Sequence, residues 1–86
     1  MLSMKLMEMR ERAKDELEHI ENGNLYQNML RQVYFDMRMN SMGKKAKYPN
    51  DKNEILKISI QMIKKWAKKD KAEFNPQFDN KFFKTQ

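Results

Sequence analysis

Few side chains in this 86-residue sequence could do chemistry, and their spacing does not assemble a catalytic group. The single histidine, His19, falls in the last turn of a predicted helix, where an imidazole usually complements the helix dipole. There is no cysteine for disulfides or thiolate metal sites, and no glycine-rich phosphate loop. The serines have almost no base that could activate a nucleophile. We therefore expect no enzyme activity, no catalytic residues, no metal site and no cofactor.

Carboxylates recur at helical spacing near the N-terminus, at Glu8, Glu11, Asp15 and Glu18. Such a row could suggest acid/base chemistry or a metal site. Basic side chains lie four residues from two of these carboxylates, in the pairs Glu8–Arg12 and Lys14–Glu18. This spacing is typical of a solvated helix face, which is the interpretation that we prefer.

Three segments have helical periodicity. The first runs from about Ser3 to Glu21, and its apolar stripe consists of Leu2, Leu6, Met9, Ala13, Leu17 and Ile20. Asn22-Gly23 is expected to end this helix, with the glycine in the left-handed conformation.

The second segment, from about Leu25 to Met42, opens with a capping box formed by Asn24 and Gln27. Gly43 is expected to end it. Its predicted inner stripe is Leu30, Val33 and Met37, flanked by Tyr26, Met29 and Tyr34.

The third segment, Asp51 to Lys69, opens with a capping box in which Asp51 accepts from the Glu54 amide. Its apolar stripe is wide, which indicates a helix buried between two neighbours. In this register Trp66 is expected to fill the core. The stripe consists of Ile55, Ile58, Ser59, Met62 and Trp66, widened by Leu56, Ile60 and Ile63.

These segments predict an all-α fold: a small three- to four-helix bundle with up-down connectivity. Two glycines and two prolines supply few of the turns that strands would need. We assign residues 1–72 to the bundle and 73–86 to a Phe-rich C-terminal tail, which we expect to dock on the bundle; the alternative is a peptide-like tail that docks into a partner. Asn75-Pro76 could begin a short fourth helix in this tail, whose phenylalanines are Phe74, Phe78, Phe82 and Phe83.

The net charge of +6 is divided unevenly along the chain. Residues 1–43 carry a net charge of −1, whereas residues 44–86 carry +7. An anionic partner is therefore expected to meet the C-terminal half first. No apolar run approaches the roughly 18 residues of a membrane span. We accordingly expect no membrane partner, and the absence of cysteine favours an intracellular compartment.

Two stretches of the chain carry a resemblance to a known family. The first reads Glu54-Ile55-x-x-Ile58-Ser59-x-x-Met62-Ile63-x-x-Trp66-x-Lys68, and the second reads Met37-x-x-Asn40-x-Met42-Gly43-x-x-Ala46-Lys47-Tyr48-Pro49. Together they resemble the amino-terminal docking domain of transcription elongation factor S-II, a domain type that also occurs in elongin A, a Mediator subunit and the Spt-interacting elongation protein.

The resemblance implies a helical bundle without enzyme activity, in the nucleus, that docks short acidic and Phe-containing peptides of other transcription factors. The basic C-terminal half suits such partners electrostatically. The residues expected to bind the partner are Lys64, Lys65, Trp66, Lys68 and Lys69.

Two other functions remain open. The first is a small nucleic-acid-binding protein of viral or plasmid type, which would contact phosphates through Lys44, Lys45, Lys47, Lys64, Lys65 and Lys68. No arginine occurs after Met42, so bidentate base readout is not available to this half of the chain. The second is a structural helper whose acidic, Met-rich N-terminal helix pairs with another copy. The sequence leaves the oligomeric state open.

Overall fold

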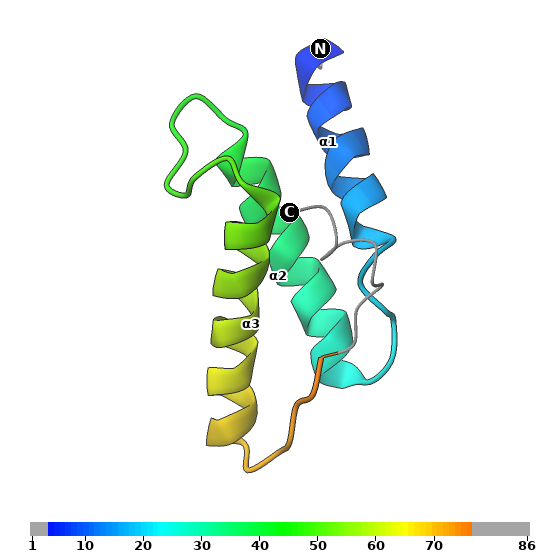
Figure 1. The fold of residues 1–86 in the computed structure, drawn as a ribbon, viewed down its shortest axis with the longest axis vertical. Helices are drawn as coiled ribbons and strands as arrows, with labels where there is room; N and C mark the ends of the chain where they lie inside the picture. The colour runs from blue at the N-terminus through cyan, green and yellow to red at the C-terminus, as the bar shows by residue number, and fades with distance from the viewer. Residues whose placement is uncertain (1–3, 77–86) are drawn as a thin grey trace.

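The computed structural model describes residues 4–76, which contain three α-helices and no strand (Figure 1). Helix α1 spans Met4–Leu17, α2 spans Leu25–Ser41 and α3 spans Lys52–Lys69. The all-α prediction is confirmed for this part of the chain. The predictions for Leu2, for a fourth helix after Pro76, and for Phe78, Phe82 and Phe83 fall outside the described residues.

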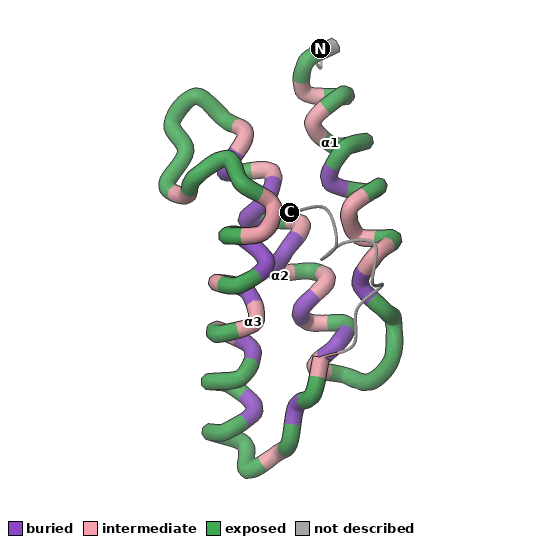
Figure 2. The backbone as a smooth tube through the Cα atoms, in the orientation of Figure 1, coloured by how far each residue is buried: buried purple, intermediate pink, exposed green. Residues whose placement is uncertain are grey.

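Helix α2 is the central element of the fold. It makes the principal helix–helix contacts, with α3 and with α1, and these two helices lie on different sides of it (Figure 1). The prediction that the third segment is buried between two neighbouring helices is therefore wrong. That position belongs to α2, and within residues 4–76 the buried residues of α3 lie along one face (Figure 2).

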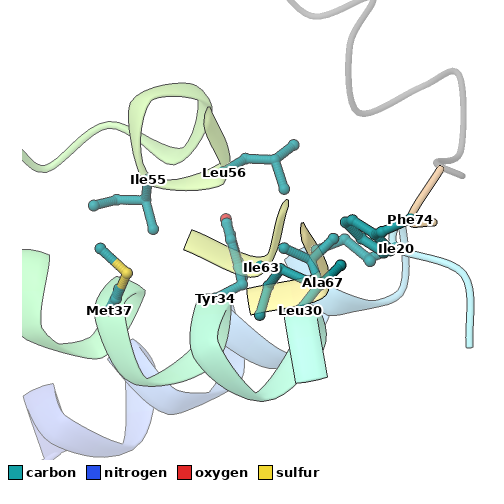
Figure 3. Close-up of a cluster of buried hydrophobic side chains, with 9 residues drawn as sticks. All are labelled: Ile20, Leu30, Tyr34, Met37, Ile55, Leu56, Ile63, Ala67 and Phe74. Atoms are coloured by element: carbon teal, nitrogen blue, oxygen red, sulfur yellow. The ribbon is translucent and has the colours of Figure 1, made fainter. Parts of the chain in front are cut away.

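The hydrophobic core lies mainly between α2 and α3 (Figure 3). Of the predicted inner stripe of α2, Leu30 and Met37 are buried, whereas Val33 is half-buried and the fully buried Tyr34 takes its place. The buried residues of this core cluster are Ile20, Leu30, Tyr34, Met37, Ile55, Leu56, Ile63, Ala67 and Phe74.

The buried face of α3 follows one row of residues at four-residue spacing, Ile55, Ser59, Ile63 and Ala67. A neighbouring row, Ile58, Met62 and Trp66, lies at the edge of the core. Trp66 is 38% exposed, so the prediction that it fills the core is wrong. Both rows are apolar at helical spacing, and only the packing of α2 decides which of them is buried.

Helix α1 ends at Leu17, four residues before the predicted end at Glu21. Its last turn tightens through hydrogen bonds between residues three apart, including Ile20 N–H to the Leu17 carbonyl at 3.0 Å. Arg31 on α2 donates through Nη1 to the carbonyl oxygens of Leu17, at 2.7 Å, and of Ile20. A side chain from another helix therefore satisfies the carbonyls at this end. Gly23 does not adopt the predicted left-handed conformation.

The N-terminal caps of α2 and α3 are formed by the predicted residues. Asn24 Oδ1 accepts from the Gln27 amide at 2.9 Å, as predicted for α2. Asp51 Oδ1 caps α3, but it accepts from the Asn53 amide at 3.0 Å rather than from that of Glu54.

Helix α3 ends in a Schellman turn. The Ala72 amide donates to the Ala67 carbonyl at 2.8 Å, and the Lys71 amide donates to the Lys68 carbonyl at 3.1 Å. Lys71, with φ of 56°, occupies the left-handed position that glycine usually takes. The turn reverses the chain and brings the following residues back toward α2.

The reversed segment packs against the start of α2. Phe74 is buried in the core, and its ring centroid lies 6.2 Å from that of Tyr26. The Tyr26 hydroxyl donates to the Asp70 carboxylate at 2.8 Å, and this hydrogen bond raises the pKa of Tyr26. The end of α3 is thus joined to the beginning of α2 by a ring contact and a hydrogen bond.

Candidate functional site

The edge row of α3 forms an apolar strip on the surface of the molecule. Ile58 and Met62 are half-buried, and Trp66 follows one helical turn later with 38% of its surface exposed. Residues four apart on a helix lie one above another on the same face. The three side chains therefore present a continuous apolar strip along α3.

A groove of about 400 Å³ lies along this strip. Lys65 and Lys69, which are four residues apart on α3, are both exposed. Three of the predicted partner-binding residues line the groove, and Trp66 and Lys69 belong to the same helical end. The lining consists of Ile58, Gln61, Met62, Lys64, Lys65 and Lys68.

A second groove, of about 450 Å³, lies on the neighbouring flank of α3. It shares Gln61 and Lys64 with the first groove, so these two side chains form a ridge between the grooves. The other residues that line it are Asn53, Glu54, Leu56, Lys57 and Ile60. We use the name α3 surface for the two grooves together with Trp66 and Lys69.

The sequence predicts the lysines at the end of α3, but its periodicity does not predict the apolar floor beside them. Ile58, Ile60 and Met62 were assigned to the core stripe, whereas the structure leaves each of them half-buried. The width of the stripe was the available signal, because a helix packed on one side only cannot bury so many apolar positions.

The lysines proposed to contact nucleic acid do not form one patch. Lys44, Lys45 and Lys47 are exposed in the loop between α2 and α3, at the end of α3 opposite to Lys64 and Lys68 (Figure 1). An α-helix of 18 residues is about 27 Å long. The structure therefore divides the predicted set into two groups at the two ends of α3.

A buried polar network connects α1 to α2 and was not found from the sequence. Arg38 is paired with Glu16, with Nε 2.8 Å from Oε1, and their side chains are only 6% and 12% exposed. Arg38 Nη1 also donates to Ser41 Oγ at 3.0 Å and to Asn50 Oδ1 at 2.7 Å. Tyr34 donates its hydroxyl proton to Glu16 at 2.5 Å.

This network holds the helices together, and its geometry does not suit catalysis. Burial, followed by the hydrogen bond to Glu16, raises the pKa of the Tyr34 hydroxyl, so that the phenol keeps its proton. Both carboxylate oxygens of Glu16 accept from Arg38, at 2.8 Å and 3.3 Å, which occupies the group that could act as a base.

The outward face of α1 is acidic. Glu8, Glu11, Asp15 and Glu18 are all exposed, which confirms the solvated face. A groove of about 490 Å³ runs beside them, and His19 lies at its end, in the turn after α1. The groove is lined by Met7, Glu8, Glu11, Arg12, Asp15, Glu16, His19 and Lys52.

Within residues 4–76 no cluster of three or more histidine, cysteine or acidic side chains could hold a metal ion. No helix in the same range is long and apolar enough to cross a membrane. The fold and the site define a class: a small all-α chain that presents a lysine-rimmed apolar surface on one helix. Models of known protein families, curated proteins and solved structures were all compared with the chain, and none of them matches it.

Proposed function

We propose that this chain is a non-enzymatic protein-interaction module whose α3 surface docks a short acidic peptide with an aromatic side chain. The observation that carries the proposal is the exposure of Trp66, at 38%, beside an apolar groove with a lysine rim. Tryptophan is enriched among the residues that dominate binding energy at protein interfaces, so a half-exposed indole next to a groove is a suitable anchor.

The two parts of the surface would act differently on such a peptide. The apolar floor of Ile58 and Met62 would take up an aromatic or aliphatic side chain and remove it from water. The rim lysines Lys64, Lys65 and Lys68, with Lys69 beyond them, would attract carboxylates and favour acidic over basic segments. Affinity would come mainly from the floor, and selectivity mainly from the rim.

The resemblance of residues 37–68 to the S-II docking domain supports a role in the transcription elongation machinery, and with it a nuclear location. The proposal includes the finer architecture expected for such a domain. The three helices would form an up-down bundle, with the Phe-rich segment 73–86 docked on it.

The test is an amide NMR titration of the labelled chain with an acidic peptide that contains phenylalanine, at low and at moderate salt. We expect shifts at Ile58, Met62 and Trp66 that survive the added salt. The Trp66→Ala variant should bind at least about tenfold more weakly, as is usual for an aromatic anchor. The matched control, Lys44→Ala, changes an exposed lysine at the other end of α3 and should bind like the parent chain. Shifts that avoid α3, or equal affinity for Trp66→Ala, would reject the proposal.

The second candidate function is non-specific nucleic-acid binding, which the exposed loop lysines Lys44, Lys45 and Lys47 favour. A short DNA duplex in the same titration distinguishes it. Phosphate contacts would shift the loop amides, and the affinity would fall with salt at a logarithmic slope of about −0.9 per contact. Removing the loop lysines would then weaken binding, whereas Trp66→Ala would not.

A further inference from the structure

We propose that copies of this chain associate head to tail, with the acidic face of α1 in one copy lying along the lysine face of α3 in the next. This inference goes beyond peptide docking, because the occupant of the α3 surface is a second copy of the same chain. It rests on charge, length and position, each of which is visible in the described residues.

The acidic face is a regular stripe. Its four carboxylates are all exposed; three lie on α1 and the fourth, Glu18, lies in the turn directly after it, so the stripe is about 15 Å long at roughly the rise of an α-helix. Met7, at 52% exposure, lies beside it and lines the adjoining groove of about 490 Å³. Arg12 and Lys14 flank the stripe, and Arg12 and Lys52 line the same groove. The negative charge is therefore confined to the stripe itself, with Met7 as the accessible apolar side chain beside it. Its carboxylates are Glu8, Glu11, Asp15 and Glu18.

The lysine face of α3 has the matching length and the opposite charge. Its four exposed ammonium groups extend over about 16 Å of helix. The two apolar grooves on this helix lie beside them and could receive Met7 of the neighbouring copy. The lysines of this face are Lys57, Lys64, Lys65 and Lys68.

The two faces cannot meet within one molecule. Helices α1 and α3 lie on different sides of α2, and the stripes are on their solvent-exposed sides (Figure 2). Complementary faces on the same chain can therefore pair only between copies. Because the two faces differ, the contact is heterologous, and each added copy leaves one acidic and one basic face free. Such association grows into chains or closes into rings.

The association is expected to be weak and sensitive to salt, since the charges are exposed and are screened beyond about 10 Å at 0.1 M ionic strength. Sedimentation velocity of the full chain from about 10 µM to about 1 mM covers the relevant range. In about 0.05 M salt we expect the average mass to rise continuously with concentration, and in about 0.5 M salt we expect association to be at least about tenfold weaker.

Two variants test the direction of the contact. The acidic-face variant is Glu11→Lys/Asp15→Lys and the basic-face variant is Lys64→Gln/Lys68→Gln, all at exposed positions. Each alone should remain monomeric, because one of its two faces is lost. Mixed together they should form 1:1 pairs and nothing larger, since only one compatible contact remains. The control Lys44→Gln/Lys45→Gln removes two exposed lysines away from both faces and should associate like the parent chain.

A parent chain that stays monomeric at every concentration in low salt overturns this inference, as does association that the basic-face variant retains in full. Mixed variants that remain monomeric overturn it as well. Peptide docking is judged separately, because the acidic-face variant keeps the whole α3 surface. Binding of the acidic peptide by this variant would uphold the proposed function whether or not copies associate.

Discussion

Helix α2 is held to its two neighbours by different types of interaction. On the α3 side, Leu30 and Met37 belong to the same apolar cluster as Ile55 and Ile63. On the α1 side, Leu17 and the following Ile20 reach this cluster. The contact there also depends on the buried ion pair of Glu16 and Arg38, on hydrogen bonds, and on the small Ala13. Apolar burial tolerates small adjustments, whereas a buried charge depends on every one of its partners.

This difference indicates which substitutions should destabilise the molecule most. The buried apolar side chains of α3 run from Ile55 near its start to Ala67 near its end, so its docking is spread over many contacts. The position of α1 depends strongly on the one guanidinium of Arg38, which reaches Glu16, Ser41 and Asn50. Changes on the two sides should therefore differ in kind as well as in size.

The largest effect is expected for Arg38→Met, which leaves the Glu16 carboxylate buried without its cation. Removing one partner of a buried ion pair costs about 3–5 kcal/mol of unfolding free energy. Hydrogen exchange should show that α1 amides lose protection before those of α3. Adding Glu16→Gln should recover much of the loss, because the amide oxygen can still accept from Tyr34. Uniform loss of protection in all three helices would show that the two sides of α2 are not distinct.

Ile63→Ala tests the apolar side. Ile63 is fully buried between α2 and α3, and truncation of such a side chain costs about 3 kcal/mol through lost burial and the cavity that remains. Urea unfolding should show this loss in a single transition shared by all three helices. A matched Lys57→Ala variant, at an exposed position of α3, should change the free energy by less than about 0.5 kcal/mol.

Tyr34→Phe tests the polar side through pH. At about pH 7 it should cost roughly 1.5 kcal/mol, because it removes a hydrogen bond to a charged acceptor. The pKa of Tyr34 is raised in the folded state, so above about pH 10 the unfolded phenol ionises while the folded one keeps its proton. The parent chain therefore loses stability relative to the variant as the pH rises further.

By about pH 11 the difference between the two proteins should shrink, by up to about 1.4 kcal/mol, which urea unfolding at the two pH values measures. Tyr26 is present in both proteins, so its contribution cancels in the comparison. A difference that does not change with pH would mean that Tyr34 is not held in a protonated, desolvated site.

The smallest change, with the opposite sign, is expected for Lys71→Gly. Lys71 has φ of 56°, a conformation that glycine adopts without the steric cost of a Cβ atom. The variant should be more stable by up to about 1 kcal/mol in thermal or urea unfolding, whereas Lys65→Gly, at an exposed position inside the helix, should be less stable by about 1 kcal/mol. Equal effects at both positions would contradict the Schellman turn.

The local features of the fold could be predicted from the sequence. The three helices and the capping residues Asn24 and Asp51 follow from neighbours within one or two turns. The end of α1 could not be predicted, because it depends on Arg31, which lies 14 residues beyond Leu17. Likewise, the pairing of Glu16 with Arg38 joins residues 22 apart, and nothing local marks either of them as buried.

The same distinction between local and long-range features applies to the candidate site. The lysines are a local feature of charge, and the structure places Lys64, Lys65 and Lys68 around one groove. Whether Trp66 is buried or exposed depends on which of two adjacent apolar rows of α3 faces α2. Periodicity alone does not distinguish the rows, since both repeat every four residues. The buried row contains Ser59, whose hydroxyl is satisfied by the Ile55 carbonyl at 2.8 Å, so it is the less apolar of the two.

The exposure of the only tryptophan also makes the chain its own optical probe. Trp66 already contacts water in the folded state. Unfolding should therefore shift its fluorescence emission maximum less than it would shift that of a core indole. A partner or a second copy that covers the α3 surface would instead take the indole out of water and shift its emission to shorter wavelengths. In this protein, tryptophan emission therefore reports occupancy of a surface rather than integrity of the core.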